Sequence, residues 1–189
     1  MESKLIKNKK AAMEMSVGTI VTIVLLMTVL ILGLVMVRTI FKVATGAIDL
    51  TNTQLTSEIN KLFSEDNTKQ VAIYPPAREI SIKKGELGGF GFGIRNTYRE
   101  EGVFSYTVTS SENSCNLDED EANSFIILGA SGDNIKIGSG DVMQNSILVK
   151  YSIPESTPLC NIRYILNVDK DEETYLSGGV SVDLEIKAK

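Results

Sequence analysis

Histidine and tryptophan are both absent from this chain of 189 residues, and it has only two cysteines. Without histidine, the chain lacks the commonest general base and the commonest ligand of transition metals. No Ser/His/Asp or Cys/His catalytic set can be assembled. A carboxylate pair of the glycosidase kind stays open, although no motif points to one. We therefore expect no enzymatic activity, no metal site and no cofactor.

Basic character is also scarce outside the N-terminus, and the formal net charge is −5. The first ten residues carry Lys4, Lys7, Lys9 and Lys10 against Glu2 alone, so the rest of the chain is acidic. Nucleic-acid binding needs a basic stripe that neutralises phosphates. We expect no nucleic-acid partner.

One long segment has no charge at all. From Ser16 to Val37 the chain is almost purely apolar, and about 22 helical residues would span roughly 33 Å. A secretory signal has a shorter core and a small-residue cleavage site after it, whereas Arg38 and Lys42 follow this run. The run predicts a membrane span. The excess of lysines before it places the N-terminus in the cytoplasm and the body outside.

Helical periodicity continues beyond the span. No proline precedes Pro75, and apolar residues recur at helical spacing up to Phe63. We predict one helix from about Met15 to about Phe63, with a bend or break at Gly46 or in the cluster Thr51-Asn52-Thr53. A short stalk after the span is the alternative interpretation.

Beyond Ser64 the periodicity becomes alternating, which predicts strands. Alternating apolar residues occur in seven runs: Val71/Ile73, Ile80/Ile82, Phe90/Phe92/Ile94, Phe104/Tyr106/Val108, Ile147/Val149/Tyr151, Ile162/Tyr164/Leu166 and Val180/Val182/Leu184/Ile186. Residues 125–128 and 134–137 predict weaker strands. The expected fold class is α+β: a long N-terminal hydrophobic helix followed by an antiparallel, immunoglobulin-like β-sandwich.

Three regions are predicted. Residues 1–11 form a basic, cytoplasmic N-terminal segment, residues 12–64 the apolar helix with its amphipathic extension, and residues 65–189 an extracellular sandwich. Cys115 and Cys160 both fall in the last region. If that region is exported, the two cysteines pair as a disulfide; two buried free thiols are the alternative.

Two motifs resemble ligand sites but lack the residues such sites need. The stretch GELGGFGFG, residues 85–93, has no Walker lysine and no helix after it, so its glycines predict a face for close packing, against a neighbouring subunit or the long helix. The stretch NLDEDEAN, residues 116–123, lacks the glycine and the terminal glutamate of a calcium loop. We expect a solvated acidic loop there and another at residues 169–173.

The N-terminus resembles the class III signal of type IV pilins, most closely those of archaeal pilins and archaellins. The resemblance rests on Lys9-Lys10-Ala11, Ala12, Glu14 and the apolar run 15–37. It implies cleavage by a prepilin-type peptidase between Ala11 and Ala12, give or take one residue. Glu14 would become the third residue of the mature chain, whereas bacterial pilins carry this glutamate fifth.

This resemblance implies a structural subunit of a surface filament, active in adhesion or motility and made by helix-driven self-assembly. Its partners would be other copies of itself, the membrane, the peptidase and an assembly machinery. The chain would lie in the cell membrane before assembly and in an extracellular filament afterwards. The residues implied in assembly are Glu14, Val17, Ile20, Val24, Leu30 and Leu34.

A second hypothesis shares every feature except cleavage and polymerisation. In it, the chain is a single-pass membrane protein whose immunoglobulin-like ectodomain binds a partner or supports the envelope. An envelope enzyme or sensor is a third hypothesis, supported only by the ability of a sandwich to host many kinds of site.

Overall fold

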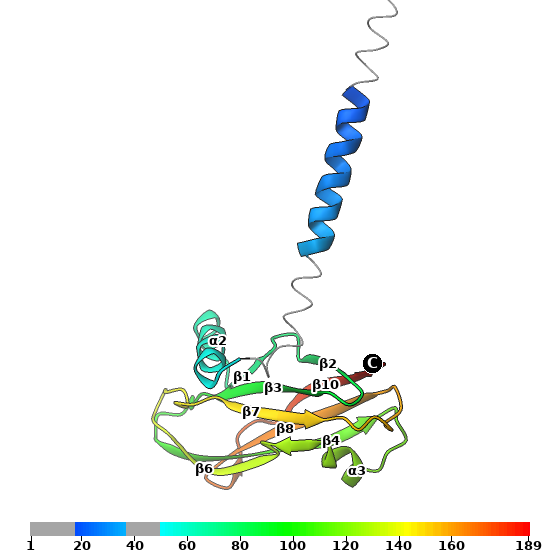
Figure 1. The fold of residues 1–189 in the computed structure, drawn as a ribbon. Helices are drawn as coiled ribbons and strands as arrows, with labels where there is room; N and C mark the ends of the chain where they lie inside the picture. The colour runs from blue at the N-terminus through cyan, green and yellow to red at the C-terminus, as the bar shows by residue number, and fades with distance from the viewer. Residues whose placement is uncertain (1–17, 37–49) are drawn as a thin grey trace, which may run out of the picture. The chain divides into compact units, whose positions relative to one another are not determined.

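The computed structural model describes residues 18–36 and 50–189 of the chain (Figure 1). The chain divides into two units, residues 1–42 and 43–189. In the first unit, the described part is a single helix, Gly18–Met36. We call the described part of the second unit, residues 50–189, the head. The predicted order of a long apolar helix and then a β-rich domain is confirmed, so the fold class is α+β.

The head contains two β-sheets. The first, which we call sheet A, has the strand order β1-β3-β7-β5: Val71–Tyr74, Leu87–Ile94, Ile147–Ser152 and Ile126–Leu128. The second, sheet B, has the order β2-β10-β8-β4-β6: Glu79–Lys83, Val180–Lys187, Asn161–Lys170, Gly102–Asn113 and Ser131–Ile137. A short strand β9, Glu173–Thr174, pairs with the end of β8. Each predicted run lies in one of these strands, β9 being an addition.

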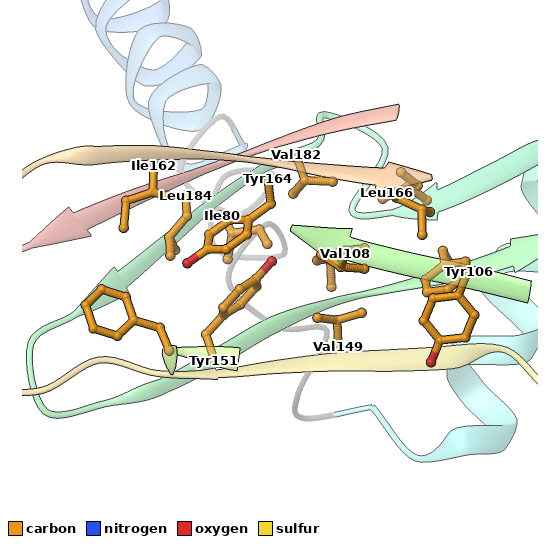
Figure 2. Packing of buried hydrophobic residues seen from close by; sticks show 14 of the residues in the cluster. Ile80, Tyr106, Val108, Val149, Tyr151, Ile162, Tyr164, Leu166, Val182 and Leu184 are labelled. Atoms are coloured by element: carbon orange, nitrogen blue, oxygen red, sulfur yellow. The ribbon is translucent and has the colours of Figure 1, made fainter. Parts of the chain in front are cut away.

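The core lies between the two sheets because alternate side chains of each strand point inward. Figure 2 shows Tyr151 of β7 facing Tyr164 of β8, with ring centroids 4.8 Å apart. Val149 of β7, Val108 of β4 and Leu166 of β8 are fully or almost fully buried in the same layer. Burying a side chain of this size stabilises the fold by about 1.5–3 kcal/mol.

One pairing corrects the antiparallel prediction. Strand β2 runs parallel to β10, with Ile80 opposite Leu184 and Ile82 opposite Ile186. Alternating residues bury one face of a strand equally well in either direction, so the pattern could not specify the direction. The other pairs in the described sheets are antiparallel.

A separate helix, α2 (Asn52–Glu65), packs on the outer side of sheet A. It begins after Thr51, whose extended backbone (ψ 156°) and side chain form a capping box with Gln54. The prediction of a single unbroken helix from about Met15 to about Phe63 is therefore wrong at Thr51. This break falls in the predicted Thr/Asn cluster, because a threonine hydroxyl that accepts a backbone N–H favours the start of a helix over its interior. Gly46, the other predicted position, lies outside the described residues.

The glycines of β3 accommodate α2. The inward residues Phe90 and Phe92 are fully buried, while Gly91 and Gly93 face the helix. A Cβ atom on Gly93 would lie 2.6 Å from Cγ2 of Ile59, which is closer than side chains pack. The prediction that the glycines of this strand form a face for close packing is confirmed, and the element that packs against this face is α2.

Candidate functional site: the apolar helix

The helix Gly18–Met36 is the candidate functional site. It has 19 residues, a mean hydropathy of 2.8 over an 18-residue window and no charged side chain, and every one of its residues is exposed. At 1.5 Å per residue it is about 28 Å long, close to the thickness of a bilayer's hydrocarbon core. By length and composition it can cross a membrane, although a signal sequence meets the same criteria.

Two threonines of this helix can lie in an apolar environment because their hydroxyl groups are hydrogen-bonded. The hydroxyl of Thr22 donates to the carbonyl of Gly18 at 2.7 Å, and that of Thr28 to the carbonyl of Leu25 at 2.8 Å. Both hydroxyls thus find acceptors within their own helix. An unpaired hydroxyl in lipid, or between apolar helices, would cost several kcal/mol.

Four of the residues implied in assembly lie on the described helix. Ile20, Val24, Leu30 and Leu34 are each more than half exposed. Most of their neighbours are also large apolar residues that are about half exposed or more, and none carries a charge. The remaining implied residues, which are Lys9, Lys10, Ala11, Ala12, Glu14 and Val17, lie outside the described residues, and their roles stay predictions.

The two cysteines form a disulfide. Cys115 follows β4, Cys160 precedes β8, and their Cα atoms are 5.2 Å apart. Of the two alternatives left open by the sequence, the structure has the disulfide rather than two free thiols. Disulfides persist in oxidising surroundings, so this bond favours a head that lies outside the cytoplasm.

The acidic stretch 116–123 is not the open loop that we expected. Residues Glu119–Ser124 form a short helix, α3, whose N-terminus is capped by Asp118 through a 2.7 Å hydrogen bond from the N–H of Glu121. Acidic side chains in the first turn favour a helix because they face its positive end. Among the described residues, no cluster of three or more acidic or cysteine side chains could hold a metal ion.

Among the hollows on the head are two that the sequence analysis did not predict. One, of about 320 Å³, surrounds Arg163 on the outer face of sheet B. The guanidinium of Arg163 contacts Asp183 at 2.8 Å and Glu112 at 3.4 Å. The hydrogen bond to Asp183 raises the pKa of Arg163. Because both carboxylates balance this charge, little of it remains for an anionic ligand.

The other hollow, of about 410 Å³, lies where β4, β6 and the turn after β8 meet. Val103 forms part of its lining, and Asp133, Asp171 and Glu172 contribute carboxylates. A hydrogen bond from Lys170 lowers the pKa of Asp171, as does one from the N–H of Val103. These carboxylates come from segments about 40 residues apart, and an alternating pattern cannot show which strands are neighbours.

Comparison with known protein families and with curated proteins finds no match to this chain. Among solved structures, it is similar to a family 123 glycoside hydrolase from Clostridium perfringens (12% identity, 59% of this chain, TM-score 0.37). It is also similar to the alkylpurine DNA glycosylase AlkC from Pseudomonas fluorescens (18% identity, 71% of this chain, TM-score 0.34). The chain spans 22% and 37% of the lengths of these two proteins.

A third similarity is to the ASH/PapD-like domain 7 of human CEP192, at 9% identity. It covers 64% of this chain and 85% of that domain, with a TM-score of 0.33. All three similarities are too remote to support an argument about function.

Proposed function

We propose that this chain is the structural subunit of a surface filament of the archaeal pilin or archaellin kind, acting by polymerisation rather than by catalysis. The observation that carries the proposal is the helix Gly18–Met36, which exposes large apolar side chains along its whole length and has no buried residue. Such a surface must be covered by lipid or by other apolar helices. In a bundle of identical helices, each copy replaces the lipid around its neighbours.

The head supports this proposal because it has a core of its own. Its sheets bury a continuous apolar cluster, and α2 packs its apolar face on sheet A. Removal of the helix from lipid would therefore leave the head's core intact. A head of this kind could coat a filament whose centre is made of the apolar helices.

Cleavage between Ala11 and Ala12 would remove the lysines that resist extraction from the membrane. Glu14 would stay on the mature chain and would need a partner in a filament core, because an unpaired buried charge is costly. The peptidase and an assembly machinery are further proposed partners. The chain would reside in the membrane before assembly and on the cell surface afterwards.

The test combines intact mass and N-terminal sequencing of the native protein with electron microscopy of sheared surface material. We expect a mature chain that begins at or beside Ala12, and filaments that contain it. A chain that keeps residues 1–11 and is never found in filaments would refute the proposal. That result would favour the single-pass membrane protein with a binding or supporting ectodomain.

A further inference from the structure

The outer face of sheet A is only partly covered by α2. The helix packs over β1 and β3, where Ala72, Tyr74 and Leu148 join its apolar contacts. At the other end of β3 and on β5, Leu87, Ile127 and Leu128 are 57%, 54% and 53% exposed. Three large apolar side chains on one face of a small domain mark an interaction surface.

These three residues lie on β3 and β5, the two strands that flank β7. Leu87 of β3 pairs with Ser152 of β7, and Leu128 of β5 pairs with Lys150 of β7. Since Tyr151 points into the core, Ser152 and Lys150 point outward, and so do their partners. Ile127 is the bulged residue that precedes Leu128. We call Leu87, Ile127, Leu128 and Lys150 the apolar patch.

The patch carries a positive charge on an acidic head. Residues 50–189 contain 21 acidic and 13 basic side chains, a net charge of −8. Lys150 is half buried and forms no ion pair with any described residue. A partner for this patch should therefore offer an apolar surface flanked by carboxylates.

The 410 Å³ hollow of the same head places carboxylates around one exposed apolar side chain. Its lining includes the exposed apolar side chain of Val103, and its rim includes Asp133 and Glu172, neither of which forms an ion pair with a described residue. Val103 points away from the core side of β4, where Phe104 is fully buried. The hollow thus opens on the outer face of sheet B, and the patch lies on the outer face of sheet A.

We propose that the apolar patch of one copy docks into the Val103 hollow of the next copy, with Lys150 facing Glu172 and Asp133. The two surfaces differ and lie on opposite faces of the head, so the contact is head-to-tail and propagates without closing. It is small against the roughly 1,200 Å² that a stable interface buries. It suits copies already held close together, as the apolar helices would hold them, rather than a freely diffusing partner.

The inference rests on the proposed function only in requiring that copies be concentrated in a membrane or a filament. Its test uses the full chain in cells, with the photo-cross-linker p-benzoyl-phenylalanine in place of Ile127. We expect a cross-linked species of twice the mass of the single chain found in the same cells, which is 20.6 kDa before any cleavage. Peptide mapping should place the link near Val103, near Asp133 or near Glu172.

Exchanging the charges of Lys150 and Glu172 tests whether these two side chains face each other across the contact. Lys150→Glu and Glu172→Lys should each lower the cross-linking yield at least fivefold, and the double variant should recover it to within twofold. Lys61→Glu makes the same charge change on the exposed side of α2 and should leave the yield unchanged. Intact disulfide and unchanged thermal unfolding in each variant would confirm that the head is folded.

The outcomes separate this inference from the proposed function. Filaments without a dimer cross-link, or with a link mapped to another segment, would overturn the docking contact and leave polymerisation standing. A mapped dimer cross-link in cells that make no filaments would support the contact and count against polymerisation. Links only to lipid or to a different protein, or no rescue by the double variant, would overturn the inference.

Discussion

Gly93 of β3 lies directly beneath Ile59 of α2, at a position where a Cβ atom would come within 2.6 Å of the isoleucine Cγ2. The side chain of Phe63 lies 3.2 Å from the same point. Arg95 fixes the end of the helix by donating to the carbonyls of Phe63 and Asp66. A helix of 14 residues is marginal alone, so these contacts hold α2 in place.

The substitution Gly93→Ala should lower the free energy of unfolding of the head by about 1–3 kcal/mol, because the added methyl group overpacks the contact. Ile59→Ala alone should cost about 2–5 kcal/mol by leaving a cavity. In the double variant the new methyl group fills part of that cavity, so the loss should be smaller than the sum. Thermal unfolding of the four proteins in detergent measures this coupling, and strictly additive losses would contradict the contact.

Two buried tyrosines provide a matched pair. The hydroxyl of Tyr164 donates to the carbonyl of Ala122 at 2.7 Å, whereas that of Tyr151 has no hydrogen-bond partner among the described residues. Tyr164→Phe should therefore destabilise the head by about 1 kcal/mol, while Tyr151→Phe should be neutral or stabilising. Denaturant unfolding tests this difference. Equal losses in both variants would show that the Tyr151 hydroxyl is bonded.

The same tyrosines should make the head labile in alkali. Burial raises the pKa of Tyr151 and of Tyr164 above the ordinary value near 10. The unfolded chain therefore loses these protons first, and stability that is complete below pH 10 falls as the pH rises further. The loss approaches about 1.4 kcal/mol per pH unit for each tyrosine. Unfolding curves at pH 8–11 should show this slope, and it should flatten when both residues are phenylalanine.

Reduction of the Cys115–Cys160 bond should destabilise the head. The cysteines are 45 residues apart, and closing a loop of this length is worth about 4 kcal/mol in the chain-entropy model. Melting temperatures with and without a reductant measure the effect. The variant with both cysteines replaced by serine should melt near the reduced protein and should not respond to the reductant. Identical melting of the oxidised and reduced protein would disprove a stabilising role.

A charge in the apolar helix tests the proposed polymer. Leu30→Arg places a guanidinium where a bundle of helices offers no carboxylate among residues 18–36. In lipid the long side chain can reach the interface, but between packed helices an unpaired charge costs about 3–5 kcal/mol. Filament yield should fall more than tenfold while the protein stays in the membrane fraction. Leu30→Met is the conservative control, and an unchanged filament yield for the arginine variant would contradict helix-driven assembly.

Local patterns predicted much of this fold. The alternation of Phe90, Phe92 and Ile94 with glycines correctly predicted which face of β3 carries the large apolar side chains and which is left to close packing, because residues two apart share a face. The parallel pairing of β2 with β10 joins segments about 100 residues apart, and no local pattern encodes that direction. Helix α3 is also absent from the prediction, since six mostly polar residues give no helical period.

The candidate site was only partly predictable for the same reason. The apolar helix is visible as an uninterrupted run of sequence, and the structure confirms residues 18–36 of it as helical. The Val103 hollow and the apolar patch each collect residues from three segments. Only the folded sheets bring these residues together.

The capped start of α2 has a mechanical consequence. A pull on the N-terminal segment enters the head at Thr51, and it must detach Leu55, Ile59 and Phe63 from β3 before it strains β1. Helix α2 would therefore detach before either sheet loses a strand. The chain between the pulled N-terminal segment and the sheets would become longer. When the force ceases, the helix can return to its place over Gly91 and Gly93, so the extension would be reversible.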